Sequence, residues 1–221
     1  MSEPATSFRP DILPAAQRRM WDAGIGVPGY FVLYGGTALA LRLGHRQSVD
    51  FDFFTARDFA PDALLRSLPG GDAATLLQSE RNTLTVLVGG DDPVKLSFFG
   101  GLPFSPVKPP DEAANGIRIA SLEDIFATKL LAAVQRSEAK DYIDIAALLA
   151  HGLPLEYGLG CARAYYGPQF NAALPLKALV YFGDGDLDSV PADVRKRLVR
   201  AVQSVHEIPT LERGTGRIGE P

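Results

Sequence analysis

The sequence predicts an α/β protein of the α+β type, in which a mixed sheet flanked by helices is followed by a helical C-terminal part. Apolar runs and alternating segments typical of strands fall before residue 120, at 30–34, 49–54, 83–88 and 94–99. Beyond residue 120 the apolar residues recur at helical spacing instead. The boundary between a mixed α/β part and a helical part is therefore expected near residue 120.

Local signals set the elements of the N-terminal part. The first helix is expected from Ile12 to Ala23, with Pro14 early in it, where proline is tolerated. The remaining expected elements are a short helix over 61–68, a hairpin joining 83–88 to 94–99 around Gly89-Gly90-Asp91-Asp92, a Pro- and Gly-rich loop over 100–116, and an edge strand over 117–119.

Caps and breakers set the helices of the C-terminal part. Ser121 opens a capping box with Asp124, which predicts a helix that runs to about Val134. A second helix is expected from Ser137 to Ala150. Further helices are expected near 155–166, 172–182 and 191–206. We therefore expect a core domain at 11–119, a helical part at 120–210 that packs on the same cleft, and a disordered tail at 211–221.

Two carboxylates lie two residues apart in a segment that alternates like a half-buried strand. Val49, Phe51 and Phe53 are expected on one face, and Asp50 and Asp52 on the other. Side chains two residues apart on a strand start roughly 6–7 Å from each other, so both carboxylates can reach one cation at about 2.1 Å, the distance that Mg²⁺ requires. The alternative is an exposed strand edge with charged gatekeepers.

A glycine pair precedes these acids by fourteen residues. Gly35-Gly36 directly follows the strand at 30–34, and Thr37 is expected to cap a short helix over 38–43 that ends at Gly44. A glycine turn lets backbone N–H groups approach a phosphate, and a helix N-terminus adds positive partial charge. The alternative is a tight turn that needs a positive φ.

The run from Gly35 to Phe54 closely resembles the AbiEii/AbiGii-type nucleotidyltransferases, which are toxin components within the DNA polymerase β-like superfamily. The resemblance extends to Lys129 and to Asp144 in the segment Lys140-Asp141-Tyr142-Ile143-Asp144-Ile145, so it spans roughly residues 30–150. It implies a nucleotidyltransferase-like fold. It also implies that Asp50 and Asp52 bind Mg²⁺ or Mn²⁺, and it assigns the nucleotide to Gly35, Gly36, Thr37, Arg46, Ser48 and Lys129.

Each of these side chains also has a structural interpretation. The hydroxyl of Ser48 can form its hydrogen bonds with the backbone, and the guanidinium of Arg46 can form its hydrogen bonds with solvent. Lys129 lies on an apolar helical row and can extend its amine to water. Asp144, amid apolar neighbours, can pair with Lys129, orient an acceptor hydroxyl or act as a base. Asp141 is expected on a solvated face beside Lys140.

One position departs from the expected pattern. A third carboxylate commonly completes the site in this superfamily, from a later strand. Lys95 and Ser97 share one face of the strand at 94–99, and Ser97 occupies the place where that third acid is expected. The departure indicates either one tightly held metal ion in place of two, or weakened activity.

Composition limits the classes of function. The net charge of −4 leaves no broad basic surface, so any RNA contact should be local and short. The single cysteine, Cys161, excludes an internal disulfide. No apolar stretch approaches 18 residues, so we expect no membrane association and a cytoplasmic protein.

The sequence thus predicts a metal-dependent enzyme that transfers NMP from an NTP to an RNA (a tRNA 3′ end, for example) or to a protein hydroxyl. It would be the toxin of a toxin–antitoxin pair, with an antitoxin protein as partner. Two alternatives remain. One is a non-catalytic module that binds nucleotide or a partner, which Ser97 favours. The other is a DxD glycosyltransferase, against which the short glycine–helix–strand sequence argues.

Overall fold

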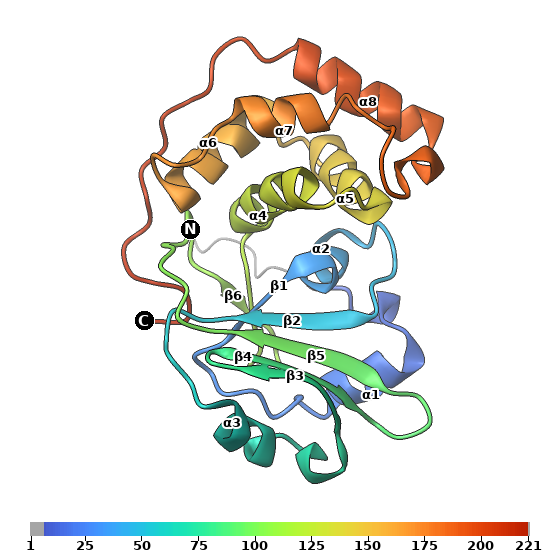
Figure 1. Ribbon diagram of the computed structural model, residues 1–221, viewed down its shortest axis with the longest axis vertical. Helices are drawn as coiled ribbons and strands as arrows, with labels where there is room; N and C mark the ends of the chain where they lie inside the picture. Colours follow the sequence, from blue (N-terminus) through green and yellow to red (C-terminus); the bar gives the residue numbers. More distant parts are fainter. Residues whose placement is uncertain (1–6, 221) are drawn as a thin grey trace. The chain divides into compact units, whose positions relative to one another are not determined.

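The computed structural model describes residues 7–220, which form two compact units. Of these residues, unit 1 contains 7–104, 109–120 and 216–220, whereas unit 2 contains Ser105–Lys108 and Ser121–Thr215. Unit 1 holds the sheet and unit 2 is helical (Figure 1).

A seven-stranded mixed sheet forms the centre of unit 1, with the strand order β3-β4-β5-β2-β1-β7-β6. The pairs β1–β7 and β2–β5 are parallel, and the other neighbours are antiparallel. The predicted mixed α/β fold is confirmed. The strands are β1 (Val32–Tyr34), β2 (Asp50–Phe54), β3 (Thr75–Glu80), β4 (Thr83–Val88), β5 (Val94–Phe99), β6 (Asp111–Glu112) and β7 (Arg118–Ile119).

Helices cover both faces of this sheet. Figure 1 shows α2 and α3 on opposite sides of the strands. Trp21 of α1 stacks on Phe51 of β2 with ring centroids 6.5 Å apart. Pro14 is the N-cap of α1, so this helix begins three residues later than expected. The helical segments of unit 1 are η1 (Pro10–Ile12), α1 (Ala15–Asp22), α2 (Gly35–Leu43), α3 (Pro61–Ser67) and η2 (Gly71–Ala73).

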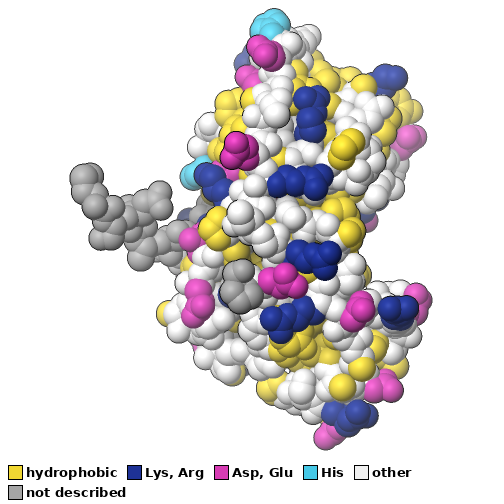
Figure 2. Space-filling model, turned by 90° about the vertical axis from the view of Figure 1, so that its left-hand side faces the viewer, with side chains coloured by type: hydrophobic (Ala, Val, Ile, Leu, Met, Phe, Trp, Pro, Cys, Tyr) yellow, Lys and Arg dark blue, Asp and Glu magenta, His cyan; other side chains and the backbone are white. Residues whose placement is uncertain are grey.

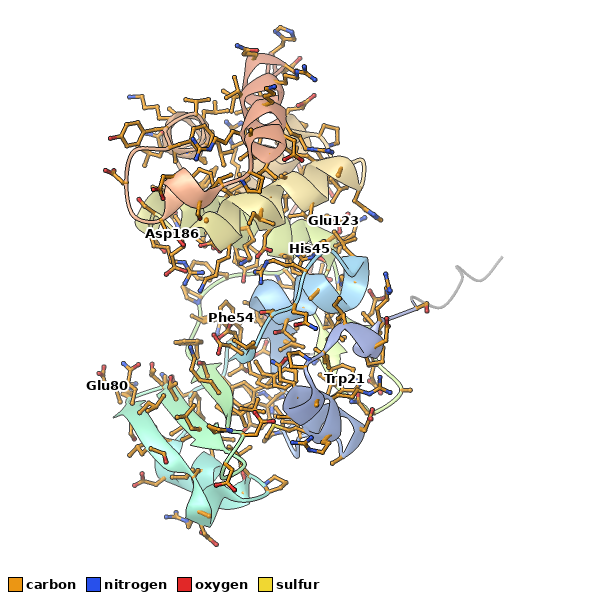
Figure 3. All side chains as sticks on the ribbon, turned by 90° about the vertical axis from the view of Figure 1, so that its right-hand side faces the viewer. Trp21, His45, Phe54, Glu80, Glu123 and Asp186 are labelled. Carbon is orange, nitrogen blue, oxygen red and sulfur yellow. The ribbon has the colours of Figure 1, made fainter. Side chains whose placement is uncertain are left out.

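The hairpin β4–β5 has the expected bounds, but the edges of the sheet differ from the prediction. Strand β7 is not an edge, because it pairs with β1 on one side and β6 on the other. Strand β3 was not expected at all. Its six residues are all exposed, up to Glu80 at its end (Figure 3), so no buried alternation marks it in the sequence.

Unit 2 consists of helices that pack around α4. The hydroxyl of Ser121 accepts a hydrogen bond from the Asp124 N–H at 3.1 Å, which confirms the predicted cap. Helices α5, α6 and α7 pack against α4, and α8 packs against α5. The helical segments are α4 (Leu122–Gln135), α5 (Ala139–Ala150), α6 (Leu155–Tyr166), α7 (Ala173–Ala178), η3 (Leu187–Ser189) and α8 (Ala192–Gln203).

Among residues 7–220, no single helix is long and apolar enough to cross a membrane. Helices α5 and α6, which meet at a bend of 115°, pass that test only as a pair, by length and composition.

The C-terminal segment is structured where we expected a disordered tail. Gly214 N–H donates to the Pro106 carbonyl at 3.0 Å within unit 2. Ile218 is buried in unit 1, where its carbonyl accepts from the Ala56 N–H at 2.8 Å. An apolar side chain with a place in the core thus anchors a segment whose composition is otherwise polar and Gly-rich. Pro221 lies outside the described residues.

Candidate active site

Strand β2 presents its two acids on one face and its phenylalanines on the other. Phe51 and Phe53 are fully buried, whereas Asp50 and Asp52 are half-buried. The predicted alternation of these four residues is confirmed. Val49 is 64% exposed and lies before the strand, so its expected place beside the phenylalanines is wrong. The ladder with β5 starts only at Asp50, and no partner strand holds Val49 in register.

Gly35 brings the turn after β1 directly against the carboxylate of Asp52. The φ angle of Gly35 is +73°, and a Cβ atom at this position would lie 2.5 Å from Asp52 Oδ2. The antiparallel register of β1 and β2 pairs Tyr34 with Asp52, which explains the close approach. Only glycine satisfies both the backbone conformation and the lack of space.

Gly36 allows two polar side chains of the next loop to approach the start of α2. A Cβ atom at Gly36 would lie 2.7 Å from Arg46 Nη2 and 2.8 Å from Ser48 Oγ. The other terminal nitrogen of Arg46 donates to the Gln47 carbonyl at 2.8 Å. A guanidinium and a hydroxyl therefore lie beside the N-terminus of a helix, where an anion is favoured.

Thr37 does not cap α2, contrary to the prediction. The helix begins at Gly35 with Tyr34 as its N-cap, so Thr37 lies inside the first turn. Its buried hydroxyl donates to the backbone carbonyl of Asp50. The expected cap is wrong because the positive φ of Gly35 already turns the chain into the helix. Thr37 instead ties α2 to the first residue of β2.

Strand β5 adds two side chains to the acidic face. Its parallel register with β2 pairs Lys95 with Asp50 and Ser97 with Asp52. Lys95 Nζ lies 3.0 Å from Asp50 Oδ2, with both side chains about one-third exposed. Ser97 is almost fully buried. The sequence placed Lys95 and Ser97 on one face, but it held no signal for which strand would lie beside β2.

In unit 2, Lys129 lies between two buried carboxylates. Its Nζ atom is 2.8 Å from Asp141 Oδ1 and 2.6 Å from Asp144 Oδ2. Lys129 is only 4% exposed, so it does not extend its amine into bulk water. The pairing with Lys129, one of the three possibilities for Asp144, is present in the structure. These ion pairs join α4 to α5.

Asp141 belongs to this cluster, and its expected solvated position is wrong. It is fully buried and accepts from Arg136 Nε at 2.7 Å as well as from Lys129. Burial alone would raise the pKa of Asp141, but the hydrogen bond from Arg136 and the charge of Lys129 outweigh burial and hold the pKa below its usual value. Its spacing of three residues from Asp144 was the signal, because such residues share a helix face.

The acidic face of unit 1 has the donor chemistry that suits a small hard cation. Carboxylate oxygens are the ligands that Mg²⁺ prefers, and Mg²⁺ usually keeps waters and substrate phosphates as its other ligands. Across the part of the chain that the structure describes, no three His, Cys, Asp or Glu side chains cluster as a metal site. Asp50 and Asp52 therefore fit a cation that a bound phosphate helps to hold, and they do not form a cage made by the protein alone.

The fold and this arrangement of residues define a nucleotidyltransferase-like α/β protein. Crystal structures from Helicobacter pylori are similar. A protein described as a proposed nucleotidyltransferase has a TM-score of 0.56 and 21% identity, over 85% of this chain and 92% of that chain. JHP933 has a TM-score of 0.55 and 21% identity, over 85% of this chain and 89% of that chain. These likenesses concern the fold.

Sequence comparison identifies the family. The profile of the family described as "Nucleotidyl transferase AbiEii toxin, Type IV TA system" matches residues 26–213, and the chain belongs to this family. An uncharacterized protein of Aquifex aeolicus (strain VF5), aq_aa25, is 34% identical over 164 residues, which are 72% of this chain and 77% of that protein. The resemblance read from Gly35–Phe54, Lys129 and Asp144 is thereby confirmed at the level of the family.

Proposed function

We propose that the chain is a metal-dependent nucleotidyltransferase that transfers NMP from an NTP to an RNA acceptor. The observation that carries this proposal is the contact between the Gly35 turn and the Asp52 carboxylate. Together with the approach of Arg46 and Ser48 to Gly36, it places an acid, a guanidinium and a hydroxyl beside a helix N-terminus in unit 1, as binding of a metal–triphosphate requires. Membership of the AbiEii family and the nucleotidyltransferase-like fold support it.

The residues of unit 1 bind and orient the triphosphate in this proposal. The backbone of Gly35-Gly36, Ser48 and Arg46 contact phosphate oxygens, while Asp50 and Asp52 bind Mg²⁺ or Mn²⁺. When bound, the cation neutralises charge on the phosphates during transfer. Thr37 acts indirectly, since its hydroxyl fixes the start of β2.

The family resemblance also assigns two residues of unit 2, Lys129 and Asp144, to the reaction. Lys129 and Asp144 are buried in one ion pair, and a direct role for either requires this pair to open. The acceptor oxygen attacks the α-phosphorus, the bond from that phosphorus to the oxygen bridging the β-phosphate breaks, and pyrophosphate leaves with the bonding electrons. The proton of the hydroxyl passes to solvent water. Asp141, which accepts from Arg136, also pairs with Lys129 and so helps to hold the Lys129–Asp144 ion pair in place.

The charge pattern of α8 favours RNA over protein as the acceptor. Lys196, Arg197 and Arg200 are exposed on this helix, which packs against α5, the helix that carries Asp144. Neighbours three and four residues apart share a helix face, so these cations can contact one phosphate backbone. On the face drawn in Figure 2, Lys and Arg side chains are interspersed with Asp and Glu and form no broad basic surface.

We also propose the role of toxin for this chain, with an antitoxin protein as its partner. The family description supports it. An NTP–Mg²⁺ substrate and an RNA acceptor imply action in the cytoplasm. Growth arrest on expression of the wild-type chain, and none on expression of Asp50→Asn, is the expected result.

The direct test is transfer of label from α-³²P-labelled NTPs to cellular RNA in the presence of Mg²⁺. We expect Asp50→Asn and Asp52→Asn to abolish labelling, because the amide cannot replace an ionised metal ligand. Asp91→Asn is the control, since Asp91 is an exposed acid of the same unit. Equal labelling by Asp50→Asn would contradict the proposal, and labelled protein in place of RNA would change the acceptor.

Calorimetry separates the enzyme from the non-catalytic module. Nucleotide binding that needs Mg²⁺ together with labelled product supports the enzyme. Binding without any product on long incubation favours the module. In that case Ser97, which lies beside Asp52 where an acid is expected, would help to explain the lack of catalysis.

A further inference from the structure

Two parallel strands place a cation and a hydroxyl beside the two acids of the proposed metal site. Lys95 is paired in register with Asp50, and Ser97 with Asp52. Parallel neighbours lie about 4.8 Å apart, and partners in register project to the same face. The four side chains therefore form a two-by-two patch on one face of the sheet, with Lys95 Nζ already 3.0 Å from Asp50 Oδ2.

The formal charge of this patch is −1, because the ammonium of Lys95 offsets one of the two carboxylates. Sites that hold two divalent ions 3.5–4 Å apart rely on carboxylates that bridge the ions. Here one oxygen of Asp50 is engaged by Lys95, and the position beside Asp52 holds the neutral hydroxyl of Ser97. A second divalent ion would meet the ammonium in place of a third acid.

We propose that this site binds a single divalent cation and that Lys95 provides the second positive charge as a fixed part of the protein. The inference rests on the proposed function. Lys95 is a positioning residue in this arrangement: it holds Asp50 Oδ2 and leaves the other carboxylate oxygen for the cation. Ser97 keeps the position beside Asp52 uncharged, so that the negative charge for a second ion is missing.

The test counts Mn²⁺ ions by electron paramagnetic resonance, with inorganic triphosphate as the ligand so that no base preference enters. We expect the wild type to bind one Mn²⁺ per chain without spin coupling between ions. The double variant Lys95→Met/Ser97→Asp should bind two, with the coupled spectrum of ions about 3.5–4 Å apart. Arg81→Met is the control, because it removes an exposed cation that pairs with Asp58 in the same unit.

Lys95→Met alone provides a second measurement, should the acid at the buried position 97 prevent folding. Removal of the ammonium frees Asp50, so Mn²⁺ should bind about three- to fivefold more tightly, the range expected for a partly exposed ion pair. Unchanged Mn²⁺ affinity in Lys95→Met would overturn the proposed role of Lys95.

Two coupled Mn²⁺ ions in the wild type would overturn the one-cation inference and leave the nucleotidyltransferase proposal intact. A lack of any Mn²⁺ binding that depends on Asp50 and Asp52 would overturn both. The two failures are thus distinguished by the spectrum of the wild type compared with that of Asp50→Asn.

Discussion

Lys129 Nζ lies 2.6 Å from Asp144 Oδ2, and both side chains are almost completely removed from solvent. Asp141 and Arg136 extend this pair to a cluster of two acids and two cations, which is formally neutral. A buried charge that loses its partner costs far more than the intact pair contributes, because the remaining charge stays desolvated. The cluster should therefore be sensitive to the loss of any single member.

Substitution of Lys129 by methionine should strongly destabilise the protein. It removes the ammonium that contacts both Asp141 and Asp144, so we expect a loss of about 3–5 kcal/mol in the free energy of unfolding. Urea denaturation at pH 7 measures it. Lys140→Met is the matched control, since Lys140 forms a half-exposed pair with Glu138. Similar midpoints for both variants would show that the cluster is not desolvated in solution.

Asp141 should make the stability of the protein depend on pH in the acid range. Its pKa in the folded chain is lowered, because the contacts with Arg136 and Lys129 outweigh the effect of burial. A lowered pKa gives a stabilisation that is complete above the unfolded pKa of about 4 and is lost as the pH falls through the folded value.

Urea unfolding at pH 7, 4 and 3 tests this linkage. The wild type should lose stability from pH 4 downwards, and Asp141→Asn should be less stable at pH 7 but show a smaller loss below pH 4. Asp193→Asn, at an exposed acid of α8, should keep the pH dependence of the wild type. An identical pH profile for Asp141→Asn and the wild type would contradict the assignment.

Local signals in the sequence predicted the elements that carry the proposed site. The strand, the glycine turn and the short helix ended by Gly44 follow from residues adjacent in the chain, and the Asp50/Asp52 face follows from alternation along one strand. The bounds of α6, β4 and β5 agree with the prediction for the same reason.

Contacts that depend on pairing between distant segments could not be predicted in this way. Lys95 meets Asp50 because β5 lies parallel to β2, and no local pattern encodes the order of strands in a sheet. Asp141 looked solvated because of its charged neighbour Lys140, but burial on a helix depends on which face its neighbours cover. Thr37 resembled a cap, whereas Gly35 had already begun the helix.

Neutralisation of α8 should weaken RNA binding in a manner that depends on salt. Lys196→Gln/Arg200→Gln removes two exposed cations, so the slope of log affinity against log salt should fall by about 1.4 for single-stranded RNA. Fluorescence anisotropy with a labelled RNA across salt concentrations measures the slope. Arg66→Gln/Arg81→Gln makes the same change in net charge on exposed residues of unit 1. Equal slopes for the two double variants would indicate that α8 does not contact the acceptor.

Gly35→Ala should abolish nucleotidyl transfer at a modest cost in stability. A residue with a side chain at a φ angle of +73° is strained by about 1–2 kcal/mol, and the new Cβ would collide with Asp52 Oδ2 at 2.5 Å. Because the collision displaces a proposed metal ligand by about 1 Å, we expect at least a hundredfold loss of transfer, on the order seen when catalytic groups are misplaced.

Gly116→Ala separates the collision at Gly35 from the backbone strain. Gly116 has a similar φ angle of +79°, but a Cβ atom there would meet nothing within 4 Å. This variant should therefore lose stability to a similar extent and keep its activity, with thermal unfolding and labelled-NMP transfer as the two measurements. If both alanine variants kept full activity, the tight contact between the turn and Asp52 would not be needed for the reaction, and the geometry that carries the proposed function would have to be abandoned.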